Sequence, residues 1–314
     1  MPRVLAGRLL QAIPLLLLVT FVSFGLSVLA PLDPARMALA AGGTGIQPDE
    51  RDVAAKRVEL GLDRPLAERY VRWWGDVLRL DFGRSFSSGR PVRDLLAQRL
   101  APSATLAVVA LGLAVGVGLP LGLLVATRVG GGLDVSLRTL SLLGGSLPGF
   151  WLALMAMWLF AARLHWVPAL GSFTPGGIIL PALVLGLRPL GRLLRLVRAT
   201  TLDALALDYV TTARAKGLAG STILLRHVLP NAIAPVLTLV GLDAAALLAN
   251  GAVIEWVFAW PGIGRLGVDA ALAGDAPVLM AFVLLVGWVV VLLNLSVDIA
   301  VAAVDPRTTH TRGA

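Results

Sequence analysis

Long apolar runs, separated by short charged segments, constrain this chain more than any other feature. Six of them come near the ~20 apolar residues that an α-helix needs to cross a bilayer. They are Leu9–Ala30, Ser103–Thr127, Ser136–Ala161, Gly177–Leu196, Ile233–Phe258 and Pro277–Val304. With 57% hydrophobic residues in 314 and a mean hydropathy of +0.83, the chain is too apolar for a soluble protein. The sequence therefore predicts an all-α integral membrane protein with six transmembrane helices.

The first apolar run fits either a cleaved signal peptide or a retained membrane helix. Arg3 and Arg8 precede it, and residues 28–30, Val-Leu-Ala, resemble a signal-peptidase site. However, signal-peptide cores usually hold only ~7–15 apolar residues. In addition, Pro31 would directly follow the cleavage site. We therefore expect residues 1–31 to form a retained N-terminal transmembrane helix.

A long polar region follows, and we expect a small folded extracytoplasmic subdomain over residues 32–100. Residues 31–100 carry 12 Lys or Arg and 10 Asp or Glu, a balance that does not suit a disordered linker. Short helices are predicted near Asp49–Leu60 and Leu66–Leu80. Aromatic residues lie among these charges, and we expect them to pack in the core of the subdomain. They are Tyr70, Trp73 and Trp74.

The distribution of positive charge predicts the orientation in the membrane. A net charge of +8 is also compatible with nucleic-acid binding, but these charges lie between apolar runs. With a cytoplasmic N-terminus, the inside segments carry 13 of the 27 Lys and Arg, and the two short outside loops carry only Arg163 and Arg265. We therefore expect both termini, including the tail 305–314, to be cytoplasmic. Residues 101–304 would form a five-helix membrane core.

The residues that the chain lacks exclude several kinds of chemistry. It has no cysteine, and His165, His227 and His310 are far apart, so we predict no catalytic thiol and no metal site. Neither Lys56 nor Lys216 follows a glycine, so there is no phosphate-binding GxxxxGK[ST] loop. We therefore predict no catalytic residue and no cofactor in this chain. If the chain takes part in active transport, the energy must therefore come from a partner protein.

A basic segment, residues 200–232, interrupts the apolar C-terminal half and falls on the cytoplasmic side. Thr200 and Asp203 resemble a capping pair at a helix start. Gly217 is placed to end that helix in a left-handed conformation, and Ser221 to cap a second helix. Apolar or small side chains at helical spacing form a narrow stripe on the first helix. They are Leu202, Leu205, Ala206, Tyr209 and Ala213.

Part of this segment resembles a family motif. Residues 213–217, Ala-Arg-Ala-Lys-Gly, and residues 227–230, His-Val-Leu-Pro, are separated by nine residues. They resemble the cytoplasmic EAA motif of binding-protein-dependent ABC importer permeases, Glu-Ala-Ala-xxx-Gly-x9-Ile-x-Leu-Pro. The chain keeps the motif at Ala213, Gly217, Leu229 and Pro230, and departs from it at Thr211, Thr212 and His227.

Other stretches, in order along nearly the whole chain, resemble the dipeptide, oligopeptide and nickel subfamily of these permeases. They are residues 8–14, 31–35, 81–85 with 91–92, 255–264, 294–298 and 305–307. The chain is thus identified as a member of that family, which implies a multi-pass protein of the bacterial cytoplasmic membrane that imports peptides or similar small solutes. A nickel or metal-chelate importer is the alternative within the subfamily. An intramembrane enzyme is disfavoured because no catalytic constellation is present, and a secondary transporter because no inverted repeat stands out.

The resemblance implies a set of partners. These are a second homologous permease subunit, two ABC ATPase subunits that bind ATP and Mg, an extracytoplasmic solute-binding protein and the lipid bilayer. The helix over residues 200–217 would dock in a groove of an ATPase subunit, whereas an ordinary amphipathic helix would lie on lipid instead. The expected coupling residues are Leu205, Asp208, Tyr209, Thr212, Ala213, Arg214, Ala215, Lys216 and Gly217.

Two further groups of polar residues are candidates for function. A charge within a membrane span is costly and usually faces a cavity or another helix. Asp243 lies mid-span, so with Asn250 it is expected to line a translocation path, where it could attract a substrate ammonium group; a charge pair with a neighbouring helix is the alternative. An aromatic, proline-containing turn at residues 255–264 is expected to form an external gate or a contact for the solute-binding protein, and an aromatic interfacial anchor is the alternative. Its candidate residues are Glu255, Trp260, Pro261 and Gly262.

Glycines in the second span predict close helix packing. Gly112 with Gly116, and Gly118 with Gly122, are pairs of small residues spaced four apart. Such pairs allow the backbones of two membrane helices to approach.

Overall fold

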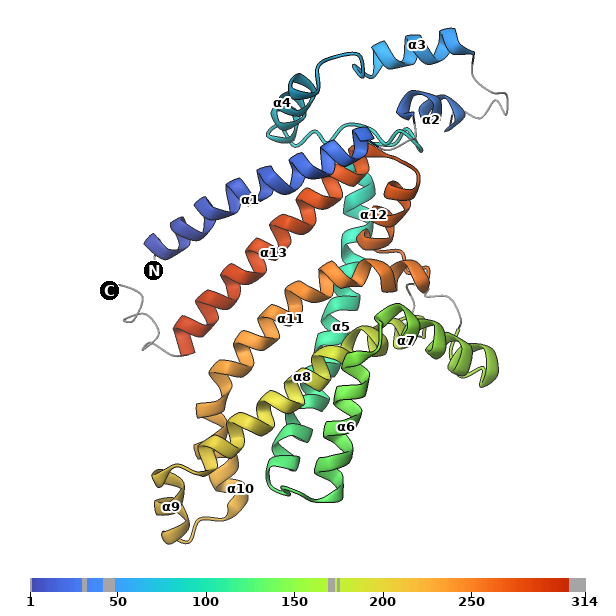
Figure 1. The fold of residues 1–314 in the computed structure, drawn as a ribbon. Coiled ribbons are helices and arrows are strands. Elements are labelled where there is room, and N and C mark those ends of the chain that lie inside the picture. The colour runs from blue at the N-terminus through green and yellow to red at the C-terminus, as the bar shows by residue number, and fades with distance from the viewer. Residues whose placement is uncertain (1, 30–32, 42–48, 169–172, 174–175, 305–314) are drawn as a thin grey trace. The chain divides into compact units, whose positions relative to one another are not determined.

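The computed structural model describes residues 2–29, 33–41, 49–168, 173 and 176–304, and these residues are mainly helical, with no β-strand among them (Figure 1). The predicted all-α class is confirmed. The chain divides into two compact units, which are described separately below. One comprises residues 1–104 with 259–291, and the other residues 105–258 with 292–314. The predicted boundaries at residues 31, 100 and 304 stay predictions.

The first unit contains the N-terminal helix, four short helices and parts of two long ones. They are α1 (Pro2–Leu29), α2 (Pro34–Ala41), α3 (Glu50–Glu59), α4 (Leu66–Val77), the start of α5 (Val92–Ala126), α12 (Ile263–Leu272) and most of α13 (Ala276–Val304). The two helices expected in the polar region are confirmed as α3 and α4. Helices α2 and α12 were not predicted, because eight to ten residues carry too little periodicity to be recognised.

The aromatic residues of α4 pack against membrane helices. Trp73 and Trp74 contact a cluster formed by Leu16 of α1, Leu284 of α13 and Val77 of α4 itself. The Tyr70 hydroxyl donates to the Leu17 carbonyl at 2.8 Å. The prediction that these side chains pack within their own subdomain is therefore correct for their contacts with one another and with Val77, but they also pack on α1 and α13. A short polar segment cannot enclose a large apolar core alone, so it buries its aromatic residues against α1 and α13.

The buried carboxylate of Asp275 fixes the loop before α5 through four hydrogen bonds. Asp275, only 1% exposed, accepts hydrogen bonds from the Ser85 and Ser87 hydroxyls at 2.6 and 2.8 Å. The backbone N–H groups of Phe86 and Ser87 also donate to it, each at 3.1 Å. Residues 81–85 belong to a stretch that carried the family resemblance. Its serine thus serves to bind the turn between α12 and α13.

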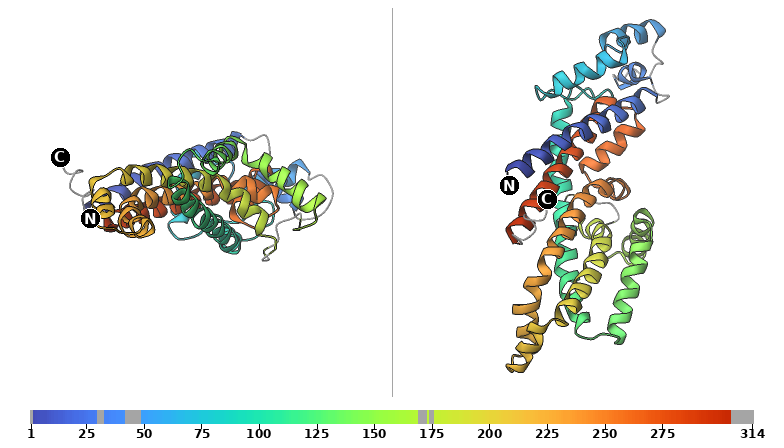
Figure 2. Two further views of the ribbon diagram at one scale, coloured as in Figure 1. Left: turned by 90° about the horizontal axis from the view of Figure 1, so that it is seen from below. Right: turned by 60° about the vertical axis from the view of Figure 1, so that its left-hand side comes forward.

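The second unit is built around helix α8. Its elements are the rest of α5, α6 (Gly132–Ser146), α7 (Gly149–Ala156), the π-helix η1 (Met157–Arg163), α8 (Ile179–Leu205), α9 (Asp208–Ala215), α10 (Gly220–Thr222), the π-helix η2 (Ile223–Val228), α11 (Leu229–Val257) and the end of α13. Figures 1 and 2 show α6 and α11 running beside α8. Both helices make extensive contacts with α8.

The membrane spans differ in detail from those predicted. Among the described residues, four helices are long and apolar enough to cross a membrane: Leu10–Val28, Val92–Ala126, Pro235–Val257 and Ala276–Ala300. The predicted span Ser136–Ala161 is not one straight helix, because α6 and the α7–η1 pair meet at 106°. Pro148, which lacks an N–H and disfavours helix at the preceding residue, explains the break. The predicted span Gly177–Leu196 is longer than expected, as α8 continues to Leu205, and its arginines exclude it from the apolar set. The count of six spans stays a prediction.

Glycines let α5 and α8 pack closely. A Cβ added at Gly122 would lie 2.7 Å from the Val197 Cβ, and one at Gly118 would lie 3.0 Å from the Leu190 carbonyl oxygen. The same holds in reverse at Gly186, where a Cβ would lie 2.7 Å from the Ala110 carbonyl oxygen. The expected role of the Gly118 and Gly122 pair is confirmed. The Gly112 and Gly116 pair faces open space in the described structure.

We predict that Gly122→Ala destabilises the protein by about 1–3 kcal/mol, because the added methyl group overlaps Val197 and must push the two helices apart. Gly116→Ala is the matched control, since nothing lies within 4 Å of its added Cβ and alanine favours a helix. Thermal unfolding in detergent compares the two variants. Equal melting temperatures for both would contradict the close packing of α5 on α8.

Candidate functional site

The basic segment begins differently from the prediction. Helix α8 runs without a break through Thr200 to Leu205. The Thr200 hydroxyl donates to the Leu196 and Val197 carbonyls at 3.0 and 3.2 Å, so Thr200 lies inside the helix and the predicted capping pair is wrong. Nothing between the apolar span and Leu205 breaks helical geometry, so packing continues the helix past the expected start. The extended residue Leu207 (ψ 150°) separates α8 from α9.

The end of α9 agrees with the prediction, but the start of the next helix does not. Gly217 has φ +76°, the left-handed conformation expected of a glycine that ends a helix. Ser221 lies inside α10, whose N-cap is Ala219, so the predicted capping role is wrong. Helices α10, η2 and α11 then follow one another directly.

Helix α9 has one buried face and one exposed face. Val210 and Ala213 are buried in a cluster with Ile223 and Val228 of η2 and with Ala204 of α8. Of the five residues in the predicted apolar stripe, only Ala213 is fully buried. Leu205 and Tyr209 are half-buried at the edge of the cluster. The remaining predicted coupling residues are exposed: Asp208, Thr212, Arg214, Ala215, Lys216 and Gly217.

This geometry suits a docking element. The apolar contacts of Val210 and Ala213 hold α9 against the ends of α8 and η2. The Asn231 amide also donates to the Tyr209 hydroxyl at 3.3 Å. The opposite face carries small and cationic side chains, Ala215, Arg214 and Lys216, that no neighbouring helix covers in the described residues. A helix fixed on one side and free on the other can transmit a push from a partner as a rigid body.

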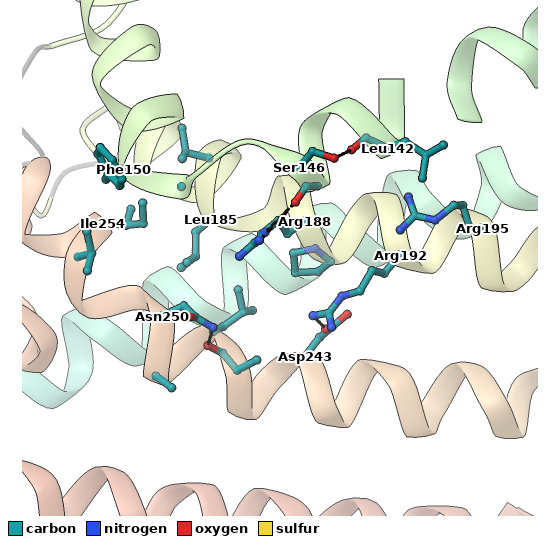
Figure 3. A pocket seen from close by; sticks show the side chains of 18 residues that line it. Leu142, Ser146, Phe150, Leu185, Arg188, Arg192, Arg195, Asp243, Asn250 and Ile254 are labelled. Atoms are coloured by element: carbon teal, nitrogen blue, oxygen red, sulfur yellow. Dashed lines mark hydrogen bonds and ion pairs between the residues drawn. The ribbon is translucent and has the colours of Figure 1, made fainter. Parts of the chain in front are cut away.

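The second unit also contains a cavity of about 630 Å³ (Figure 3). Helix α8 contributes Arg188, Arg192 and Arg195, and α11 contributes Asp243 and Asn250. The end of α6 and the start of α7 line the rest. Its apolar lining includes Phe150, Leu185, Leu247, Val253 and Ile254. Both predicted path residues, Asp243 and Asn250, therefore lie at one cavity.

Asp243 forms an ion pair with Arg192 of α8. Of the two alternatives from the sequence, the structure contains the charge pair with a neighbouring helix. Asp243 is 2% exposed, whereas the Arg192 side chain is 47% exposed. The carboxylate is thus shielded behind the guanidinium group. Asn250 donates to the Ala246 carbonyl of its own helix at 2.8 Å.

Sequence reasoning did not identify the three cavity arginines as a site, although their spacing carried a signal. Positions 188, 192 and 195 share one face of a helix. Arg188 donates to the Gly145 carbonyl at 3.3 Å, and Arg195 to the Ser141 hydroxyl at 2.9 Å. One turn further, Arg198 binds the buried Asp134 through two hydrogen bonds of 2.7 and 2.8 Å. These bonds attach α8 to α6.

The predicted gate residues lie around a real helix break. Helix α11 ends at Val257, Ala259 adopts φ +54°, and α12 starts after Gly262. Glu255 is buried at the end of the second unit. Trp260 is fully buried in the first unit and its indole N–H donates to the Pro102 carbonyl at 3.1 Å. Trp260 is thus an internal side chain and not an interfacial anchor. The gate function stays a prediction.

We predict that Arg192→Gln lowers the melting temperature more than Asp243→Asn does. Losing Arg192 leaves a charged, buried carboxylate without its ion-pair partner, at a cost of roughly 1–3 kcal/mol. Losing Asp243 leaves a half-exposed guanidinium that water can solvate. The double variant Arg192→Gln/Asp243→Asn should be more stable than Arg192→Gln alone. Additive effects of the two substitutions would show that the pair does not contribute.

Comparison with protein-family models gives two matches that together cover most of the chain. Residues 118–310 match the model described as "Binding-protein-dependent transport system inner membrane component". Residues 1–107 match the corresponding N-terminal model of these transport-system membrane components.

Individual relatives agree along the whole chain. A putative peptide transport system permease protein of Brucella abortus (strain 2308) is 37% identical over 99% of this chain and 100% of its own length. The glutathione transport system permease protein GsiC of Pectobacterium atrosepticum is 40% identical over 95% of this chain and 96% of its own. Among solved structures, the inward-facing MetNI methionine ABC transporter matches with a TM-score of 0.59. It is 20% identical and covers 67% of this chain and 96% of its own, so it supports the fold alone.

Proposed function

Because this chain belongs to the family of binding-protein-dependent transport system inner membrane components, we propose that it imports peptides and is driven through α9 by a partner ATPase. Its family makes it a permease subunit of an ABC importer in the bacterial inner membrane, not an enzyme. The observation that carries the proposed coupling is the exposed face of α9, supported from behind by buried Val210 and Ala213.

The proposed assembly follows from the family. An ABC importer needs ATPase subunits and an extracytoplasmic binding protein, and we propose a second permease subunit as a further partner. ATP and Mg would bind only to the ATPase subunits. The exposed residues Asp208, Thr212 and Ala215 of α9, with Gly217 as its rigid end, would enter a groove of one ATPase. Closure of the ATPases would then move α9 together with α8 and η2, on which it packs.

The departures from the motif fit this division of α9 into two faces. Thr211 and Thr212 stand where the family motif has Glu and Ala, and both are exposed. The Thr212 hydroxyl donates to the Asp208 carbonyl at 3.1 Å, so its hydrogen bond is made within α9. The motif residue Ala213 is instead buried. We infer that Thr211 and Thr212 change the docking surface and leave the packing of α9 unchanged.

We propose peptides, not metal chelates, as the transported solute. The two relatives described above are named for peptide and glutathione transport, and glutathione is itself a peptide. The described residues contain no group of histidine and acidic side chains that could hold a metal ion. A chelate would not require such a group, so the proposal rests on the relatives.

We predict that Ala215→Arg abolishes association with the ATPase subunit and reduces ATP-driven uptake at least tenfold, because a long charged side chain would block insertion of the exposed face. Ala199→Arg is the matched control, since Ala199 is an exposed alanine of α8 outside α9. Co-purification of the ATPase and peptide uptake into proteoliposomes measure the effect. Equal losses for both variants, or unchanged coupling for Ala215→Arg, would contradict docking through α9.

A further inference from the structure

The cavity in the second unit holds more positive than negative charge. Three guanidinium groups from α8 and one carboxylate, Asp243, line it. Asp243 pairs with Arg192, which leaves Arg188 and Arg195. In the described part of the chain, these two donate only to neutral groups, the Gly145 carbonyl and the Ser141 hydroxyl. The cavity therefore has an excess of two positive charges.

An arginine at position 188 carries a large free-energy cost. Residue 188 lies within the predicted fourth membrane span, where a charge costs at least ~2.5–3.5 kcal/mol unless it faces water or a polar group. The bond from Arg188 to Gly145 is long, at 3.3–3.4 Å for both nitrogens, and its side chain is exposed in the cavity. A structural role for this guanidinium would require shorter bonds to buried acceptors, as Arg198 makes to Asp134.

The contrast between Arg198 and Arg188 indicates different tasks on one helix. Arg198 has a 17% exposed side chain and fills its hydrogen-bonding capacity with a buried carboxylate. Arg188 and Arg195 keep donors available on the cavity side (Figure 3). A guanidinium group binds a carboxylate through two parallel hydrogen bonds, which makes arginine the preferred partner of that group.

The size and lining of the cavity fit a small solute. Its volume of about 630 Å³ lies within the ~300–1,000 Å³ typical of small-molecule sites. Apolar side chains, including Phe150 and Ile254, line the end away from Arg195, and Asn250 adds a polar group. Such a lining combines an anion-binding end with an apolar surface for side chains.

We propose that Arg188 and Arg195 form a carboxylate-binding site for the terminal carboxylate of the peptide as it crosses the membrane. This inference rests on the proposed peptide transport. Asp243 is not an ammonium site, because it is buried and bound to Arg192. Its role is to neutralise Arg192 and hold it beside the other two arginines, so that two guanidinium groups, and not three, lack an acidic partner among the described residues.

The test compares two peptides that differ only in the carboxylate, trialanine and trialanine amide. Uptake of each labelled peptide is measured in proteoliposomes that contain the complete transporter with its binding protein. Selection by the binding protein is the same for every permease variant, so it cancels when the acid-to-amide uptake ratio of a variant is divided by that of the wild type. Arg188→Gln/Arg195→Gln should lower this ratio about tenfold. Arg188→Lys/Arg195→Lys should retain most of it, and Arg128→Gln, an exposed arginine outside the cavity, should leave it unchanged.

Each outcome is decisive. An unchanged ratio in the double glutamine variant overturns the carboxylate site. A parallel loss of both peptides also overturns it, because it shows that the arginines serve folding, lipid or another subunit. If the wild-type transporter moves neither peptide, the proposed function fails. Equilibrium binding of labelled trialanine to the purified complex without binding protein then still decides the site, since the double glutamine variant should lose it.

Discussion

The second unit depends on accommodating a helix that carries four arginines within a membrane protein. Helix α8 is held on three sides by different interactions. Glycines bring it against α5, the Arg198–Asp134 pair attaches it to α6, and the Arg192–Asp243 pair attaches it to α11. Each ion pair buries a carboxylate almost completely, and such a carboxylate is tolerated only while its guanidinium stays in place. The charges thus determine which helices must be neighbours.

Features that repeat along the chain were predictable from the sequence. Apolar runs longer than twenty residues predict membrane helices. Gly217 was predictable because few residues other than glycine adopt positive φ without strain. The family motif could be recognised from local spacing alone. These inferences need no knowledge of which helices meet.

Features that depend on tertiary contacts were not predictable. The Arg192–Asp243 pair joins residues 51 positions apart, and nothing local distinguishes it from a pair of functional charges. Thr200 has a capping pattern, but the packed helix continues through it because its hydroxyl bonds to its own backbone. The sequence did show the regular spacing of Arg188, Arg192 and Arg195. Without knowledge of the facing helix, that spacing is equally compatible with a cytoplasmic surface.

One continuous helix connects the proposed coupling element to the proposed solute site. Helix α8 contains Arg188 and Arg195 near its middle, and its last turn supplies Ala204 to the cluster that holds α9. If an ATPase displaces α9, the displacement passes through the packed Ala204 to α8 and then along that one helix to the cavity arginines. The carboxylate site on α8 would then move together with α9, while Asp243 on α11 contacts it from the neighbouring helix. Binding and release of an anion could thereby follow ATPase closure through a single element, while the Arg192–Asp243 pair keeps α8 attached to α11.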